Sequence, residues 1–341
     1  MTRRVLAFVV LATASLTAQS GPPIGGHYQD SYAAPRTPWG DPDLQGTWPG
    51  TAMMGVPLER PASLGDKAVF TDQEFAARAA QAQRLAAQDD EEFLAPRATP
   101  TPDAILTGAG TGPPGHWGER GKPSHQTSLV VDPANGRIPP MTADGQSRTA
   151  AIPASRFYDN SGAGVFNGPE DLSVYDRCIT RGLIGSMVAI GYNAGNQIVQ
   201  GPGWVAIRNE MIHEARVIPV DGRRHVSPVI RTYMGDSVGR WDGTTLVVDT
   251  TNFNGRTGIG ANGRAIYHSD ALHVVERFTR VDADTLQYEA TIDDPKTWTR
   301  PFTIAFPLTR DPGYGMFEYA CHEGNYGLRN ILSAARAADR R

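Results

Sequence analysis

Ionisable side chains interrupt apolar strand patterns in the last third of this 341-residue chain, between residues 204 and 326. Asp249 directly follows two valines, and Glu276 directly follows two more. A carboxylate on the buried face of a strand is costly unless a partner or a ligand compensates it. We therefore expect this part of the chain to carry the function.

The strand around Glu276 predicts an acid–base group. Side chains alternate between the two faces of a strand, so Glu276 shares a face with Val274, and His273 lies on the other face. If the first face is interior, Glu276 is a carboxyl group in an apolar wall, which suits proton donation or abstraction near neutral pH. The competing interpretation is a structural ion pair with Arg208 or Arg300.

A second acid–base pair is expected near the C-terminus. In a strand, Glu318 and His322 share one face and Cys321 lies on the other. A histidine beside a carboxylate suits proton transfer. We expect Glu276 as acid or base, His322 as its partner, and Asp249 and Glu318 as orienting groups. The competing interpretation for the C-terminal pair is a hydrogen bond that orders this segment.

Other polar residues are expected to bind a small molecule at the mouth of the fold. Aromatic side chains in the same region suit stacking on sugar rings or on terpenoid and aromatic ligands, although such residues often serve only as core. The predicted substrate-binding residues are His213, Glu210, Tyr288, Arg208 and His273.

Several classes of site are not expected. His213, His225, His268, His273 and His322 form no short metal-binding pair such as His-x-His, which argues against a metal. There is no phosphate-binding glycine loop, no dinucleotide fingerprint and no Gly-x-Ser-x-Gly motif, so no cofactor is predicted. A net charge of -4 offers no basic surface for nucleic acid.

The ends and the cysteines predict export. Residues 1–20 read as a signal peptide, with two arginines followed by about a dozen apolar residues, too few to span a bilayer. We expect a periplasmic or secreted protein without a membrane span. In an oxidising compartment the only two cysteines, Cys178 and Cys321, favour a disulfide over two free thiols.

The remaining chain predicts a mainly β protein. Residues 21–45 read as an extended lead-in, and residues 46–341 as a single β-rich domain with a long loop at about 95–127. A surface helix over 72–88 has Thr71 as N-cap and Glu74 completing a capping box, and a short helix is expected over 328–338. Strands are predicted at 128–132, 137–138, 198–200, 204–210, 213–219, 231–234, 245–251, 273–280, 285–293, 299–308 and 316–321.

Evenly spaced strands joined by tight turns indicate an antiparallel β-barrel or sandwich. The turn dipeptides include Pro202-Gly203 and Asp242-Gly243, which are typical of tight connections. Gly46-x-Trp48 at the first strand is also how lipocalin-type barrels begin. The fold class is therefore a lipocalin-like barrel or a sandwich with two flanking helices.

Four blocks carry a family resemblance. Residues 128–140, 239–253, 273–278 and 318–326 resemble signature blocks of a large family of exported bacterial proteins, and the match extends from residue 41 to residue 336. The resemblance implies export and supplies no reaction mechanism. The strand pattern of the same region is similar to that of calycins.

Three functions remain open at this point. The first is an exported enzyme that uses carboxylate and histidine acid–base chemistry on a small molecule, as a lyase, hydrolase or isomerase. The second is a binding protein in which the same polar groups fix a ligand and no bond is broken. The third is a structural envelope protein with a buried polar network.

Overall fold

The computed structural model describes residues 32–94, 118–119, 121–153, 156, 166–188, 191–259 and 266–339. The predicted signal peptide, the first part of the lead-in and most of the predicted loop at 95–127 lie outside the described residues.

Two antiparallel sheets form the body of the protein. The larger sheet has six strands in the order β2-β12-β11-β10-β7-β6. Each strand pairs antiparallel with its neighbour, so the mainly β prediction is confirmed. The strands are β2 Val130–Asp132, β6 Asp236–Asp242, β7 Thr245–Thr251, β10 His273–Arg280, β11 Thr285–Asp293 and β12 Phe302–Thr309.

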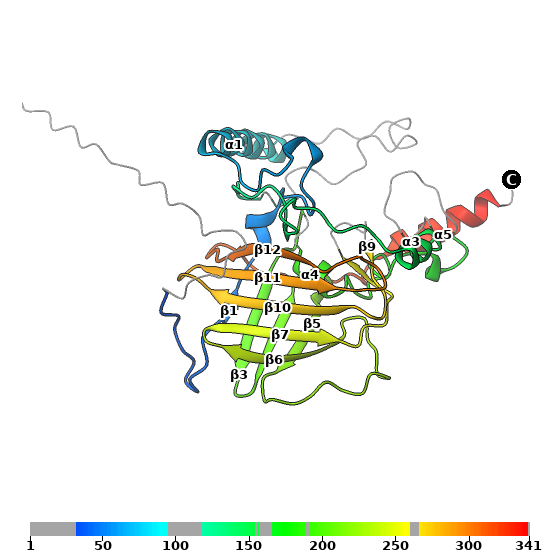
Figure 1. Cartoon of the computed structure of the whole chain (residues 1–341). Coiled ribbons are helices and arrows are strands. Elements are labelled where there is room, and N and C mark those ends of the chain that lie inside the picture. Colours follow the sequence, from blue (N-terminus) through cyan, green and yellow to red (C-terminus); the bar gives the residue numbers. More distant parts are fainter. Residues whose placement is uncertain are drawn as a thin grey trace, which may run out of the picture.

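The smaller sheet has four strands in the order β1-β3-β4-β5. Figure 1 shows β3 and β5 passing behind the six-stranded sheet at a steep angle, so the two sheets form a sandwich. The strands are β1 Gly46–Thr47, β3 Asn196–Gly201, β4 Trp204–Asn209 and β5 Ala215–Pro219. A separate two-stranded sheet pairs β8 Gly258–Ile259 with β9 Ile266–Tyr267. The finer description, a lipocalin-like barrel, stays a prediction.

Alternating burial along the strands builds the core between the sheets. Every second residue of β10 is buried, from Val274 through Glu276 and Phe278 to Arg280. The face assignment predicted for this strand is therefore confirmed. Inward apolar residues of the smaller sheet, among them Ile207 and Ile218, belong to the same core cluster.

Four helices within the described ranges accompany the sheets, and α4 Leu183–Met187 is fully buried and contributes to the core. They are α1 Asp72–Leu94, α3 Ala143–Ala150, α4 Leu183–Met187 and α5 Tyr326–Ala338, and Figure 1 shows α1 above the strands and α5 to one side. Short 3₁₀ turns are η1 Gly50–Met53, η2 Ala62–Leu64, η5 Pro169–Asp171 and η6 Met211–His213. The predicted capping box of α1 is present, because the Thr71 N–H donates to Glu74 and the Glu74 N–H donates to the Thr71 hydroxyl.

Trp48 fills the core beside the first strand. Its side chain is fully buried, and its Nε1–H donates to the Leu44 carbonyl oxygen at 2.8 Å. The Arg310 guanidinium lies 4.7 Å from the ring centroid, within the range of a cation–π contact. The tryptophan of the Gly-x-Trp pattern therefore packs where β1 meets the chain that follows β12.

Three of the predicted strands are wrong. Residues 137–138, 231–234 and 316–321 are irregular, and the strand that precedes β7 is instead β6. The prediction missed β6 because Gly239 breaks its apolar alternation. A side chain at Gly239 would meet Val220 at 2.7 Å, so this glycine permits close packing of β6 on the preceding chain.

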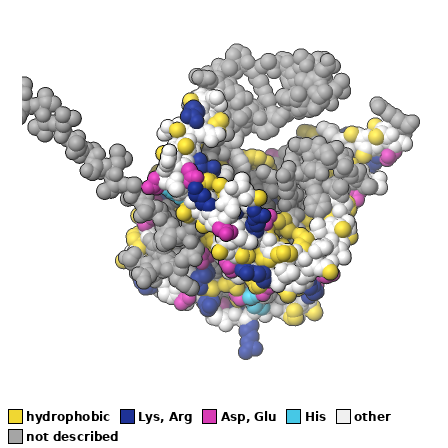
Figure 2. All heavy atoms as spheres, turned by 45° about the horizontal axis from the view of Figure 1, so that its top comes forward, with side chains coloured by type: hydrophobic (Ala, Val, Ile, Leu, Met, Phe, Trp, Pro, Cys, Tyr) yellow, Lys and Arg dark blue, Asp and Glu magenta, His cyan; other side chains and the backbone are white. Residues whose placement is uncertain are grey.

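No helix among the described residues combines the length and apolar character needed to cross a bilayer. Figure 2 shows positive and negative side chains intermixed with apolar patches over one face of the molecule.

Candidate functional site

Glu276 lies in the core of the sandwich and not in an open cavity. Its carboxylate accepts hydrogen bonds from both terminal nitrogens of Arg216, at 2.5 and 2.6 Å. The Tyr288 hydroxyl donates to the same carboxylate at 3.0 Å. Glu276 and Tyr288 are completely buried and Arg216 is nearly so. The predicted pairing of Glu276 with His322 is not formed, because Glu276 is enclosed by these two partners.

The arginine that pairs with Glu276 differs from the two that the sequence suggested. Arg208 lies on the outward face of β4, and Arg300 pairs with Asp132 at 3.0 Å on the surface. Arg216 comes instead from β5, where it lies opposite Ile207 on the inward face. The ion-pair interpretation of Glu276 therefore holds with a different arginine.

Buried charges continue from this ion pair toward the edge of the sandwich. The Glu214 carboxylate accepts hydrogen bonds from the Thr180 hydroxyl at 2.6 and 2.7 Å. Burial still raises the pKa of Glu214 above its ordinary value, and burial lowers the pKa of Arg181 nearby. Half-buried Glu214 thus lies within electrostatic reach of Arg181 and Arg216, so charges of both signs are present beside the core ion pair.

Asp249 lies on the opposite face of the six-stranded sheet from Glu276. Cross-strand register places Asp249 between Val238 of β6 and Val275 of β10, all on the outer face. Its two oxygens each meet an imidazole: Oδ1 lies 2.9 Å from His225 Nε2, and Oδ2 lies 2.9 Å from His273 Nε2. The structure therefore brings together Asp249 and His273, two of the predicted site residues.

His225 was considered in the sequence only as a metal ligand, and its role here was missed. The connection between β5 and β6 folds over the outer face and places the His225 ring between two carboxylates. Its Nδ1 lies 2.9 Å from Asp236 Oδ2, and Arg223 donates to the other oxygen of Asp236 at 2.9 Å. The short His-to-Asp spacing of 11 residues was the only sequence signal for this contact.

Hydrogen bonds hold together a four-residue cluster, which consists of Asp236, His225, Asp249 and His273. Burial disfavours the ionised form of Asp249, but hydrogen bonds from His273 and His225 outweigh it, so its pKa lies below the ordinary value. Burial likewise opposes ionisation of Asp236, and Arg223 and His225 outweigh it and lower the pKa of Asp236.

His273 completes the cluster as its accessible end. Its Nε2 bonds Asp249, and its side chain is 40% exposed. Within the described part of the chain, the other ring nitrogen, Nδ1, has no hydrogen-bond partner. His273 thus bonds Asp249 through Nε2 and keeps part of its ring open to solvent, a geometry compatible with a general base oriented by a carboxylate.

The remaining predicted residues lie at a third place, beside the C-terminal segment. The predicted disulfide is present between Cys178 and Cys321. Glu318 and His322 are exposed on this irregular segment, and Glu210 is buried beneath it. His213 Nδ1 lies 2.9 Å from the Tyr319 carbonyl oxygen.

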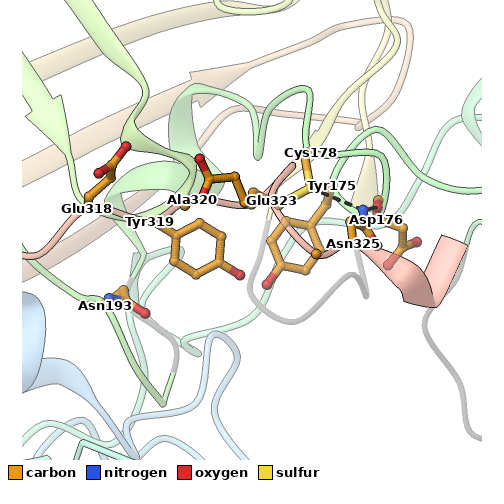
Figure 3. Close-up of a pocket in the computed structure, with 11 residues that line it drawn as sticks. Tyr175, Asp176, Cys178, Asn193, Glu318, Tyr319, Ala320, Glu323 and Asn325 are labelled. Atoms are coloured by element: carbon orange, nitrogen blue, oxygen red, sulfur yellow. Dashed lines mark hydrogen bonds between the residues drawn. A yellow bond between two sulfur atoms is a disulfide. The ribbon is translucent and has the colours of Figure 1, made fainter.

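A hollow of about 470 Å³ opens beside the disulfide. It lies between the turn that carries Tyr175 and Cys178 and the segment 318–325, with Asn193 at one end (Figure 3). Glu318 lines this hollow, and His322 does not belong to its lining. The predicted site residues are thus distributed over the core, the outer face of the large sheet, the outward face of β4 and the surroundings of the C-terminal segment, where only Glu318 lines the hollow.

Fold and site together define an antiparallel β-sandwich protein with an Asp–His cluster on its outer face. Among the described residues, no group of three or more His, Cys, Asp or Glu is arranged to hold a metal ion. The chain matches no protein-family model, no curated protein and no solved structure. The family resemblance of the four sequence blocks therefore stays a prediction.

Proposed function

We propose that the protein is an exported enzyme that performs acid–base chemistry on a small molecule, with His273 as the general base. The observation that carries the proposal is the position of Asp249, whose two oxygens bond His225 and His273 at 2.9 Å each. In this proposal the base lies on the outer face of the sheet and is not Glu276, which is held by Arg216 in the core.

The residues of the cluster have different roles in this proposal. Asp249 orients His273 and stabilises the imidazolium that forms when His273 takes a proton. His225 and Asp236 hold Asp249 from the other side, because His225 bonds both carboxylates. A base of this kind abstracts a proton from a substrate carbon or from a water molecule, which fits lyase, isomerase or hydrolase chemistry.

The surroundings of Asp249 favour a terpenoid or aromatic substrate over a sugar-like one. Val238 and Val275 flank Asp249 in the cross-strand register, and both are half-buried. Val229 and Ile230, in the connection that carries His225, are more than half exposed. Apolar surface beside a base suits a small molecule whose reacting bond lies next to an apolar ring or chain.

The test is a comparison of turnover by the wild type and by His273→Asn and Asp249→Asn variants. A panel of terpenoid and aromatic esters, glycosides and ketones is assayed for product release and, in D₂O, for proton exchange at carbon by NMR. Loss of a general base reduces turnover about 10²- to 10⁴-fold. His322→Asn is the matched control, because His322 is exposed and lies outside the cluster, and it is expected to keep wild-type turnover.

Two results separate catalysis from ligand binding. A His273→Asn variant that keeps ligand affinity and loses turnover supports the proposal. If no panel compound is turned over by the wild type, or if His273→Asn turns compounds over at the wild-type rate, the proposal is wrong. Loss of affinity and turnover together would favour the binding protein.

A further inference from the structure

The hollow beside the disulfide is a separate feature, because it shares no residue with the Asp–His cluster. Figure 3 shows the rings of Tyr175 and Tyr319 beside each other, with their hydroxyl groups directed toward one another. The carboxylates of Glu318 and Glu323 turn to the opposite side of the same segment. A molecule lying along this segment therefore meets phenols at one edge and carboxylates at the other.

A strained turn supports the aromatic wall. Ile212 and His213 are consecutive and both have left-handed backbone conformations, with φ of 60° and 44°. Such a conformation is unfavourable for a residue other than glycine and persists only where the surrounding structure holds it. For a β-branched residue such as Ile212 it is a genuine outlier.

The residues of this turn contact the two tyrosines that line the hollow, Tyr175 and Tyr319. Met211 and Ile212 form a small buried cluster against which Tyr175 and Tyr319 pack. The His213 ring contacts the Tyr319 carbonyl oxygen at 2.9 Å. The strained backbone of Ile212 and His213 therefore lies at the residues that position the two tyrosines. This coincidence indicates that the hollow is a binding site.

Glu210 at the start of the same turn fixes the neighbouring chain. It is 1% exposed and accepts hydrogen bonds from the Phe317 N–H at 2.9 Å, the Tyr314 hydroxyl at 2.6 Å and the Asn193 side-chain amide at 3.1 Å. The amide group of Asn193 is occupied by this bond, which leaves its side-chain oxygen as an acceptor beside the hollow.

The lining selects against anionic ligands. Burial raises the pKa of both Tyr175 and Tyr319, so the two phenols stay protonated and can donate hydrogen bonds. Among the described lining residues there is no Lys or Arg, and the carboxylates of Glu318 and Glu323 repel an anion. The Arg181 guanidinium carbon lies 5.7 Å from the centroid of the Tyr175 ring, and its positive charge repels a cation stacked on that ring.

We infer that this hollow binds a small neutral polyhydroxylated molecule of the sugar class, independently of the acid–base cluster. Its hydroxyl groups donate to the carboxylates and to Asn193 and accept from the phenols. Its ring face packs on tyrosine, as sugar rings do on aromatic side chains. The site is distinct in ligand class from the apolar substrate proposed for the Asp–His cluster.

The experiment is titration calorimetry of the full chain with glucose, galactose, maltose and cellobiose, with acetate and tetramethylammonium as charged probes. Binding of at least one sugar is expected at concentrations up to the order of 10 mM, the range of a weak single site. Tyr319→Phe, which removes only the hydroxyl group, should weaken this binding about tenfold if one hydrogen bond is lost. Tyr326→Phe is the matched control, because Tyr326 is 67% exposed and outside the lining.

His213→Gly separates a ligand site from a structural role. Glycine adopts a positive φ freely, so this variant is expected to unfold at the same or higher denaturant concentration than the wild type. It loses the contact with the Tyr319 backbone and should therefore weaken sugar binding. The inference is overturned if no sugar binds, if either charged probe binds more tightly than every sugar, or if Tyr319→Phe and His213→Gly both bind as the wild type does.

Discussion

Glu276 of β10 and Arg216 of β5 join the two sheets through a two-point ion pair at 2.5 and 2.6 Å. Burying a charge pair in this position costs desolvation free energy, and its net contribution to stability depends on both charges being fully paired. Tyr288 donates to the same carboxylate, so the pair is extended by a neutral donor. The Arg216–Glu276 pair therefore has a structural role in joining the two sheets.

Glu276→Gln should lower the free energy of unfolding by about 3–5 kcal/mol, because it leaves Arg216 buried without its counter-charge. A double variant, Glu276→Leu with Arg216→Met, should recover much of the loss because both charges are then absent. Urea unfolding followed by circular dichroism measures the difference. Arg277→Met is the control, since its pair with Asp242 is exposed and such pairs contribute about 0–1 kcal/mol.

Removal of the disulfide by Cys178→Ser with Cys321→Ser should destabilise the chain by several kcal/mol. The bond joins residues 143 apart, and closing a loop of about 100 residues or more corresponds to ~4–5 kcal/mol in the chain-entropy model. Hydrogen exchange should become faster over residues 314–325. Reductant should destabilise the wild type and leave the double variant unchanged; equal exchange rates in both proteins would contradict this prediction.

Acidification should weaken the Asp–His cluster. The folded-state pKa values of Asp236 and Asp249 lie below their ordinary values. Their contribution to stability is therefore present above about pH 4, the range of unfolded aspartate, and is lost as the pH falls through the folded-state pKa values.

The measurement is the free energy of unfolding in urea between pH 7 and pH 3 for the wild type and for Asp236→Asn with Asp249→Asn. The double variant should lose less stability below pH 4 than the wild type. Asp242→Asn serves as the comparison, because the Asp242 side chain is 59% exposed. If the free energy of unfolding falls with pH equally in the wild type and in the double variant, Asp236 and Asp249 do not have lowered pKa values in the folded state.

Trp48→Ala should lower the free energy of unfolding by about 3–5 kcal/mol, because it leaves a large cavity in a fully buried position. Arg310→Met should have a smaller effect, about 0.5–2 kcal/mol, from the lost cation–π contact. Both changes are measured by chemical unfolding. A loss for Arg310→Met as large as that for Trp48→Ala would show that the arginine, and not the indole, anchors this end of the sandwich.

Local patterns predicted much of the fold. The bounds of β7, β10 and β11 agree with the alternation of apolar residues and the turns between them. The helix after Thr71 was predicted from its capping box, although it extends to Leu94. Such features depend on neighbours in sequence, so they are readable without the tertiary structure.

The segment 316–321 shows where this reasoning fails. Its alternation of side chains is compatible with a strand, but its backbone is held by other contacts. The Phe317 N–H donates to the Glu210 carboxylate, and the Tyr319 carbonyl meets His213. Long-range side-chain partners replaced a sheet ladder, and no local pattern signals them.

For the candidate sites, too, some features were predictable from the local sequence and others were not. The sequence alone placed Glu276 on the same strand face as Val274, identified His273 and Asp249 as strand residues, and favoured a disulfide between the two cysteines. It did so because strand alternation, and cysteine pairing in a chain with a predicted export signal, follow from few local possibilities.

Only the tertiary structure decided the partners. Arg216 reaches Glu276 because β5 crosses behind β10, and His225 reaches Asp249 because a connecting segment folds over the outer face. The crossing of two sheets and the path of a connection depend on packing of the whole domain. As a result, Glu276 is enclosed in the core and Asp249 pairs with histidines on the surface, although the two acids lie on the neighbouring strands β10 and β7.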